Sequence, residues 1–372
     1  MKVQPKSSFV SLFLFSLLAR HAFALTFRVI THDVNAGMKD PANKPQLDVY
    51  KANSEDADAL ILLVQDGAFT EEDLPSVQEG LGFEDETYEV LHFKKEEHKR
   101  LHTFVIFKKA TKDKLESIDI KEDKAVQWDA EEGNATGYFA VKMTIDGHLY
   151  LIANVNLENE EDKKEQANKQ LAEIYEYITL EKNQHLYGTQ NPKEIKAKNG
   201  EADDGKEITV IMGGSFVKTG KKTLEKLGAE NDQDAILAAF KDNVGEGPLI
   251  DWMARDKAQY DSFVAEEGDH KRYAKTVFEE VGITFNPSEV YEVHGGDKPE
   301  DEAVYGKIGE KAEMSYTNRI LYHVGADKEV SASGYELVLE TAISNSKPVK
   351  VTIEDKNVYK QKAAEPKGSD EE

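Results

Sequence analysis

Two short runs of apolar and β-branched residues constrain the fold of this chain more than any other feature. Residues 59–64 read ALILLV, and residues 208–212 read ITVIM. A short run without alternating polar residues is typical of a strand that is covered on both faces. Strands of this kind need packed layers on each side, so the two runs predict an α/β protein with internal sheets.

Other segments mix β-branched, aromatic and apolar residues and also predict strands. The turn signal Asp146-Gly147 separates two of them and predicts a hairpin. Besides the two runs, the expected strands are Leu25–Val34, Tyr88–Phe93, Thr103–Phe107, Tyr138–Ile145, Leu149–Asn156, Ile283–Phe285, Arg319–Tyr322 and Val349–Ile353. Helices are expected over Lys163–Leu180, whose apolar residues follow a helical spacing, and over Asp232–Phe240. One α/β domain with two packed sheets is predicted, although an open α/β sheet also fits the periodicity.

The N-terminus has the organisation of a secretory signal peptide. Lys2 and Lys6 precede the short apolar segment Phe9–Ala19, and Ala22-Phe23-Ala24 has the small-x-small form of a cleavage site. The predicted division is a signal peptide over residues 1–24, a folded domain over 25–357 and a disordered acidic tail over 358–372. The apolar segment is short for a membrane span, so we expect secretion to the extracellular space.

The composition narrows the classes of partner. The 372-residue chain carries 47 basic and 71 acidic residues, which gives a formal net charge of -24. Such a surface repels phosphate backbones and attracts cations such as Ca²⁺, so nucleic acid is not an expected partner. The chain has no cysteine, which excludes disulfides and thiolate ligands of metals or haem. Asn134-Ala135-Thr136 is the one clear N-glycosylation sequon, with Asn134 as the acceptor.

Two segments near the C-terminal end resemble the paired signatures of one enzyme family. Ser315–Tyr322 reads SYTNRILY, and Ser344–Val349 reads SNSKPV. They resemble the P-[SA]-W-[TC]-D-R-I-L and S-D-H-[RK]-P-V signatures of inositol polyphosphate 5-phosphatases, in the endonuclease/exonuclease/phosphatase superfamily. The resemblance implies a four-layer α/β sandwich, in which two facing mixed sheets carry helices on their outer faces. An insect salivary nitrophorin shares that fold, but its haem ligand is a Cys thiolate, which this chain lacks.

The resemblance implies a metal site at the ends of the first two strands. Thr31-His32-Asp33-Val34 stands where the family has T-W-N-V, and Val64-Gln65-Asp66 stands where it has L-Q-E, whose Glu holds Mg²⁺. Asp33 and Asp66 are the corresponding carboxylates, and carboxylate oxygens suit hard cations. No cofactor is expected, although Mg²⁺ or Ca²⁺ could bind these two residues. His32 replaces a core Trp and is expected to pack.

In the middle of the chain, the family's catalytic groups are replaced. Asn156 stands where the N-S-H-L motif has a His that contacts the scissile phosphate. Gly213–Phe216 resembles the G-D-[LF]-N motif, so Gly214 stands for the Asp that orients the attacking water. Phe216 stands for the Asn that binds the phosphate, and an apolar ring is expected at that place.

The two C-terminal signatures have lost their reactive groups as well. Asn318 and Asn345 replace Asp residues, and Ser346 replaces a His. In the family, this His is tied to an Asp and stabilises the phosphate in the transition state. The scaffold residues around these positions are retained, so the resemblance implies a phosphatase-like fold without its chemistry.

Two hypotheses from different classes follow. The first is a secreted, catalytically inactive inositol-phosphatase-like protein that binds an extracellular protein or a small ligand. The alternative is a divergent Mg²⁺-dependent extracellular phosphatase or phosphodiesterase. That enzyme would need Asp33 and Asp66 to hold the metal and an unrecognised residue to act as the base.

Three further histidines lie near a charged turn. His92, His98 and His102 flank or fall within the segment Lys94–Arg100. They are expected to be solvated, and a surface zinc site is the less favoured interpretation because no second ligand cluster is evident.

Overall fold

The structure is a computed structural model that describes most of the predicted domain. It covers residues 24–34, 37–39, 41–83, 86–95, 98–128, 136–157, 208–216, 317–324, 329–341, 343–344 and 346–358, with Gln166, Gln170, Glu173, Ile174, Tyr177 and Val281. Outside the described residues lie residues 1–23, the segment 359–372, the predicted elements Asp232–Phe240 and Ile283–Phe285, and the residues Asn134 and Asn345.

The first of two sheets has six strands in the order β10-β11-β1-β2-β4-β3. Its strands are β1 (Leu25–Asp33), β2 (Ala59–Gln65), β3 (Tyr88–Lys95), β4 (His98–Lys108), β10 (Val330–Leu337) and β11 (Val349–Asp355). Strands β1 and β2 are parallel, and the remaining neighbours are antiparallel. The apolar run predicted as a strand buried on both faces is β2, and every one of its residues is buried.

The second sheet has five strands in the order β5-β6-β7-β8-β9. Its strands are β5 (Ile118–Gln127), β6 (Gly137–Ile145), β7 (His148–Asn156), β8 (Ile208–Ser215) and β9 (Asn318–Val324). Only β7 and β8 run parallel within it. The predicted hairpin joins β6 to β7, and its turn residues Asp146 and Gly147 both have positive φ, at 47° and 81°.

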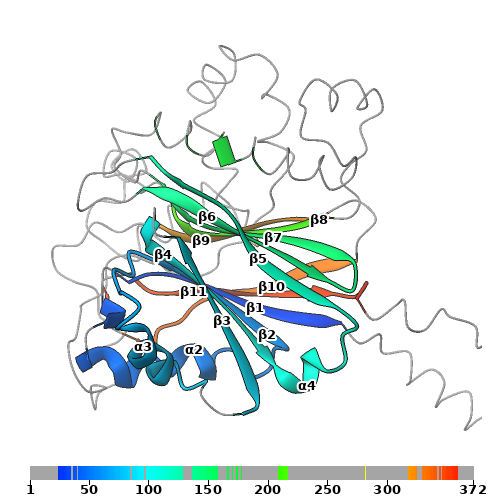
Figure 1. Cartoon of the computed structure of the whole chain (residues 1–372), viewed down its shortest axis with the longest axis horizontal. Helices are drawn as coiled ribbons and strands as arrows, with labels where there is room; N and C mark the ends of the chain where they lie inside the picture. The colour runs from blue at the N-terminus through cyan, green and yellow to red at the C-terminus, as the bar shows by residue number, and fades with distance from the viewer. Residues whose placement is uncertain are drawn as a thin grey trace, which may run out of the picture.

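The two sheets face each other across the main apolar core, with helical residues on both outer faces (Figure 1). The outer face of the six-stranded sheet packs against α2 (Val49–Ala52) and α3 (Leu74–Leu81), and η2 (Pro41–Gln46) contacts α3. The outer face of the other sheet packs against the helical residues Ile174 and Tyr177. The short helices η1 (Gly37–Lys39) and α4 (Lys109–Lys112) complete the described elements. The sandwich prediction is confirmed, and the open-sheet alternative is not.

Two strands were not predicted, and both lie at sheet edges. Strand β5 reads IDIKEDKAVQ, and a register shift between Glu122 and Lys124 breaks its alternation. Strand β10 reads VSASGYEL, and its register shifts between Ser333 and Glu336. Edge strands tolerate charge and bulges because one side has no partner strand, so their sequences resemble loops. Among the helices that the structure describes, none has the length and apolar surface that a membrane crossing requires.

The strand ends that the motifs mark meet at one edge of the sandwich. Asp33 at the end of β1 lies opposite Gln65 at the end of β2. In the other sheet, Asn156, Ser215 and Asn318 lie side by side on β7, β8 and β9. The segment that precedes β11 reaches the same edge, where Ser346 accepts a hydrogen bond from Asn318.

Candidate functional site

A chain of neutral side chains joins the two sheets at this edge. The Thr31 hydroxyl donates to Oε1 of Gln65 at 3.1 Å. Gln65 Nε2 donates to Oδ1 of Asn154 at 2.6 Å, across the space between the sheets. Asn154 Nδ2 in turn donates to the backbone carbonyls of Val64 and His102, at 3.0 and 2.9 Å. The three side chains are fully buried, so their amide groups form a satisfied network without any charge.

A second neutral group ties β9 to the segment before β11. Asn318 Nδ2 donates to the Ser346 hydroxyl at 2.7 Å and to the Lys347 carbonyl at 2.8 Å. Beside Asn318, the buried Ser215 hydroxyl finds no hydrogen-bond partner among the described residues. Both side-chain amide hydrogens of Asn318 are therefore used within the protein, and neither is available to a negatively charged ligand.

His32 fastens the same segment from the other side. Its Nε2 lies 2.8 Å from the Ser346 carbonyl, which can only accept, so Nε2 carries the proton and donates. Nδ1 must then accept from the Tyr50 hydroxyl, 2.6 Å away. Burial lowers the pKa of His32 to about 3; the Ser346 carbonyl opposes this shift, and Lys347 adds to it. The packing role expected for His32 matches this buried, neutral, hydrogen-bonded position.

Lys347, in the same segment, has a buried amino group that is bound to the backbone. Its side chain is fully buried, and Nζ donates to the backbone carbonyl of Thr341. Burial lowers the pKa of Lys347 to about 8, while the nearby Glu340 carboxylate opposes the shift. The hydrogen bond links Lys347 to Thr341, whereas the lowered pKa of Lys347 shows that burial disfavours its charged form.

At two glycines near the end of β8, the surrounding atoms leave no space for a side chain. A Cβ on Gly213 would lie 2.6 Å from Leu63 Cδ1 and 3.3 Å from Thr31 Cβ, so this position faces the opposite sheet. A Cβ on Gly214 would lie 1.8 Å from the Val155 carbonyl oxygen of the neighbouring strand. Only glycine fits at position 214 without a shift of the backbone.

Comparison with known proteins identifies the arrangement. No protein-family model matches the sequence, and no curated protein sequence matches it significantly. Among solved structures, the inositol polyphosphate 5-phosphatase domain of SPsynaptojanin, in complex with inositol (1,4)-bisphosphate and a calcium ion, superposes with a TM-score of 0.50. The two chains are 12% identical, and the match covers 94% of this chain and 91% of that one.

A mutant Cimex nitrophorin in its ferrous NO complex superposes with a TM-score of 0.52 at 12% identity, covering 89% of this chain and 98% of the nitrophorin. The chain has the endonuclease/exonuclease/phosphatase fold. Identities this low establish the fold alone, so the chemistry must be argued from the side chains.

The motif comparison implies that the Phe216 ring lies at the strand-end site, but in the structure the ring points to the outer face of the five-stranded sheet. Its ring belongs to the outer core of the five-stranded sheet, with Val210, Met212 and Leu321. The Arg319 guanidinium lies over the ring at 5.3 Å from its centre, and both side chains are buried. Successive strand residues point to opposite faces, so a shift of one residue exchanges the two faces. Gly213 and Ser215 are the β8 residues that face the other sheet.

Four of the other substituted positions lie near strand ends. Asn156, Gly214, Asn318 and Ser346 fall at the end of β7, the end of β8, the start of β9 and the closing segment. The sequence interpretation missed Gln65 and Asn154 as a pair. A polar residue that directly follows a buried apolar run, as Gln65 does, is the signal that could have drawn attention to it.

One of the two carboxylates proposed as metal ligands is already paired with a cation of the protein. Asp66 is ion-paired with the Arg100 guanidinium, which offsets its charge. Asp33 lies opposite Gln65, whose amide is committed to Asn154. In the described part of the chain, no group of three or more His, Asp or Glu side chains could hold a metal ion. The metal that the fold family implies therefore supports no step here, and Asp33 and Asp66 remain predictions.

The histidines near the charged turn differ from expectation. His102 is fully buried, and its ring stacks on Phe69 with ring centres 3.6 Å apart. His92 Nε2 lies within hydrogen-bonding distance of His102 Nδ1, at 3.1 Å. The turn is shorter than predicted, so His102 falls within β4, while His92 lies in β3 as predicted. The ring of Phe69 contacts both imidazoles. The His98 side chain lies outside the described residues.

Proposed function

We propose that this chain is a secreted, catalytically inactive protein of the endonuclease/exonuclease/phosphatase fold that acts by binding an extracellular protein or a small ligand. The observation that carries this proposal is the hydrogen bond from Asn318 to Ser346. An amide and a hydroxyl, bonded to each other, occupy the positions where the resembling family has an acid and an imidazole.

The electrostatics of the strand ends support the same proposal. Phosphoester hydrolysis needs a group that positions water and donors or cations that meet the developing charge. Gln65, Asn154 and Asn318 are neutral and use their amides on one another, on Ser346 or on backbone carbonyls. The cations Arg319 and Lys347 are bound over Phe216 and to Thr341 instead. Losing one such electrostatic group typically costs about 10²–10³ in rate.

The predicted location agrees with a binding role. A signal peptide over residues 1–24 would deliver the chain to the extracellular space, and a net charge of -24 keeps such a protein soluble. A surface of this charge favours partners with basic or neutral surfaces over polyanions.

Hydrolysis can be tested directly on the purified secreted chain. We would measure turnover of phosphoinositides, sphingomyelin and DNA with and without Mg²⁺, beside an Asp66→Ala variant. The proposal predicts no turnover above buffer with any of the three substrates. A rate that depends on Mg²⁺ and disappears with Asp66→Ala would establish the divergent enzyme instead.

A matched variant separates real activity from contamination. Asp56 is exposed and ion-paired with Arg28 at the opposite end of β1, so Asp56→Ala removes an acid of similar kind away from the strand ends. Activity that survives in both variants equally would be attributed to a contaminant. Co-purification from the native secretion would then identify the partner.

A further inference from the structure

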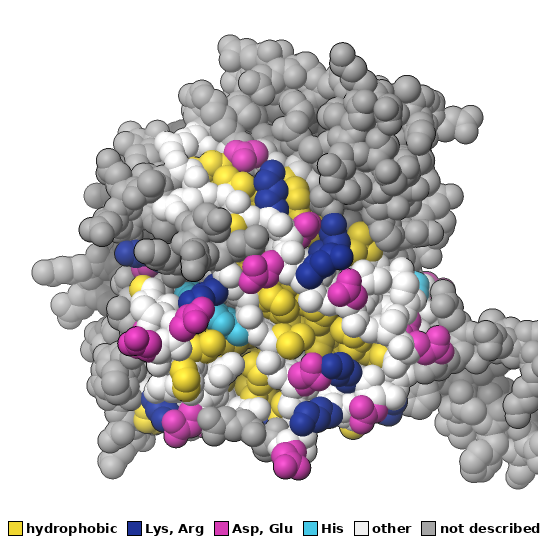
Figure 2. Space-filling view, in the orientation of Figure 1, with side chains coloured by type: hydrophobic (Ala, Val, Ile, Leu, Met, Phe, Trp, Pro, Cys, Tyr) yellow, Lys and Arg dark blue, Asp and Glu magenta, His cyan; other side chains and the backbone are white. Residues whose placement is uncertain are grey.

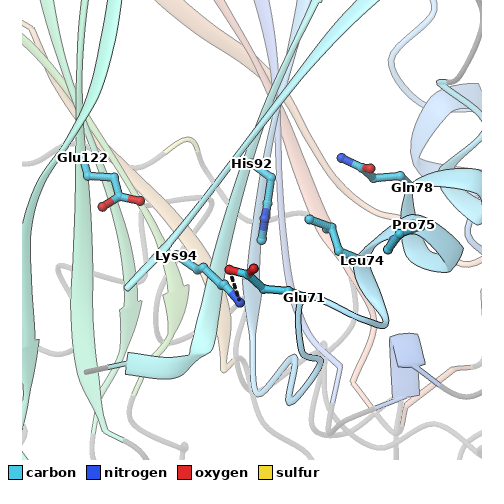
Figure 3. Close-up of a pocket in the computed structure, with 7 residues that line it drawn as sticks. All are labelled: Glu71, Leu74, Pro75, Gln78, His92, Lys94 and Glu122. Atoms are coloured by element: carbon cyan, nitrogen blue, oxygen red, sulfur yellow. Dashed lines mark ion pairs between the residues drawn. The ribbon is translucent and has the colours of Figure 1, made fainter. Parts of the chain in front are cut away.

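The six-stranded sheet has an open edge at β3. Strand β3 pairs with β4 on one side, and no described strand pairs with its other side. In Figure 3, His92 and Lys94 of β3 lie between Gln78 on α3 and Glu122 on β5. These four residues belong to the lining of a hollow of about 430 Å³. The open edge therefore borders a depression between a helix and the neighbouring edge of the other sheet.

The backbone groups that β3 presents at this edge follow from its pairing with β4. Opposite residues of two antiparallel strands alternate between pairs that exchange hydrogen bonds and pairs that do not. The Lys109 amide donates to the Thr87 carbonyl, in the same register that pairs β3 with β4. Every second residue after Thr87 therefore bonds to β4, and the intervening residues Tyr88, Val90 and His92 point their amides and carbonyls outward.

The hydrogen bonds of β4 give the same assignment. The Lys108 amide donates to the carbonyl of Asp58, next to the start of β2. Lys108 thus bonds towards β2, and its opposite residue Tyr88 is left without a bond from β4. Among the described residues, no hydrogen bond reaches the outward backbone groups of Tyr88, Val90 or His92. These donors and acceptors are available to another strand.

The middle of β3 lacks the features that usually protect an edge strand. Such strands are commonly blunted by charged residues, proline or a bulge. Residues Val90–Phe93 read VLHF, and the register shift of β3 comes only after Phe93. Strand β5, at the nearby edge of the other sheet, reads IDIKEDKAVQ and carries charges along its middle. The unprotected edge of β3 therefore favours the addition of a strand.

The side chains beside the open edge offer apolar contacts on both faces of the sheet. Phe93 packs against the core between the sheets, and Val90 and Leu74 pack against the outer core. The ring of His92 is held in place by its hydrogen bond to His102, at 3.1 Å. Figure 2 shows hydrophobic side chains on this face with acidic and basic side chains around them. Alternate side chains of an added strand would thus meet apolar surface on each face.

The charges around the edge select the kind of strand. Lys94 is ion-paired with Glu71 at 3.3 Å, and Lys112 is ion-paired with Glu89. An uncharged segment leaves these pairs intact, whereas a charged one would compete with them. The net charge of -24 repels a second copy of the chain and attracts basic residues beyond the docked segment.

We propose that the open edge of β3 binds an extended, uncharged segment of a partner protein that is flanked by basic residues. The segment adds to the sheet as a further strand and forms main-chain hydrogen bonds with Tyr88, Val90 and His92. Its alternate side chains contact Phe93 on one face and Leu74 on the other. This inference rests on the binding role proposed above and names its surface, whereas the hydrolysis assays test the loss of catalysis separately.

Calorimetry with peptide probes tests the docking on the full secreted chain. The parent probe is the end-capped peptide Lys-Thr-Val-Thr-Val-Thr-Lys. One control carries N-methyl groups on its five central residues, and the other has Glu in place of both Lys residues. We expect the methylated control to bind at least about tenfold more weakly, because its main-chain donors are lost, and the acidic control about fivefold more weakly. No heat with the parent probe, or equal binding of either control, would overturn the proposal.

Amide hydrogen exchange locates the bound probe. We expect exchange at Tyr88, Val90 and His92 to slow at least about tenfold when the parent probe is bound, because these amides gain an acceptor. Exchange at Leu91 should not change, since its amide already bonds to β4. Protection that appears elsewhere, without this alternation along β3, would reject the edge as the site.

A matched pair of proline variants tests the edge itself. Val90→Pro removes an outward amide without removing a bond to β4, a position at which edge strands tolerate proline. It should weaken binding of the parent probe at least about fivefold. Val330→Pro is the control, because the Lys356 amide donates to Glu329, which leaves the Val330 amide outward on the distant edge strand β10. Equal weakening by both variants, or a dimer of the unmodified chain that Val90→Pro abolishes, would overturn the proposal.

Discussion

Asn318 and Ser346 are joined by a hydrogen bond of 2.7 Å although 28 residues separate them in the chain. The bond fixes the start of β9 to the segment that leads into β11, and the second amide hydrogen of Asn318 reaches the Lys347 carbonyl. The hydrogen bonds of Asn318 therefore stabilise the junction between β9 and the segment that precedes β11.

We therefore expect Asn318→Ala to lower the free energy of unfolding by about 2–3 kcal/mol, because a buried hydroxyl and a buried carbonyl lose their donor. Urea denaturation monitored by tryptophan fluorescence would measure the change. Asn357→Ala is a suitable control, since its amide donates to Asp355 in a half-buried turn and its removal should cost about 1 kcal/mol or less. Similar losses in both variants would contradict the role given to Asn318.

His32 should make the protein sensitive to acid. Its pKa in the folded chain is about 3, below the ordinary value of 6.5. The stability associated with the neutral ring is thus complete above pH 6.5 and is lost as the pH falls towards 3, by up to about 5 kcal/mol.

The comparison that isolates this effect is His32→Gln against the unmodified chain. The variant is expected to be less stable at pH 7, and its stability should fall less steeply between pH 6.5 and 4. His323→Gln, which removes a half-buried imidazole at the end of β9, should leave the steep profile unchanged. Parallel profiles for His32→Gln and the unmodified chain would count against the buried, neutral His32.

Removing the ion pair between Asp66 and Arg100 tests whether Asp66 can bind a metal ion. Arg100→Gln removes the guanidinium that pairs with Asp66 and should change stability by only about 0–1 kcal/mol, because the pair is partly exposed. We expect Mg²⁺ to bind more tightly to this variant than to the unmodified chain, as measured by calorimetry, yet phosphoinositides should still not be hydrolysed. Turnover by Arg100→Gln would mean that the ion pair, and not the missing base, prevents catalysis.

The close approach of the two sheets at Gly213 can be measured as a coupling free energy between Gly213 and Leu63 in a double-mutant cycle. Gly213→Ala would place Cβ 2.6 Å from Leu63 Cδ1, and overpacking of this kind typically costs about 1–3 kcal/mol. Leu63→Val shortens the opposing side chain, so the double variant should be more stable than the sum of the two single changes predicts. Additive losses would show that the two residues do not meet.

Much of the fold could be predicted from the sequence, because buried strand positions are occupied by apolar residues in a regular pattern. Strands β1, β2, β6, β7 and β8 are covered by neighbours, and their residues had to be apolar on one or both faces. Strands β5 and β10 escaped prediction because an edge strand can carry charges, serine and glycine without exposing a core.

Motif spacing drew attention to Asn318 and Ser346, but it did not predict the hydrogen bond that joins them. It could not reveal the contact between Gln65 and Asn154, which are 89 residues apart and carry no shared motif. It also assigned Phe216 to the wrong face, because motif alignment does not determine which face of a strand a residue occupies.

The glycine at position 214 limits how the end of β8 can be redesigned. A carboxylate could be introduced at Asn318 by one substitution, but any side chain at position 214 would collide with the Val155 carbonyl, which a Cβ would approach to 1.8 Å. Strands β7 and β8 would have to move apart before a larger residue could be accommodated. A single substitution at position 214 would therefore disrupt the sheet, and a polar group can be placed there only together with changes in the neighbouring strand.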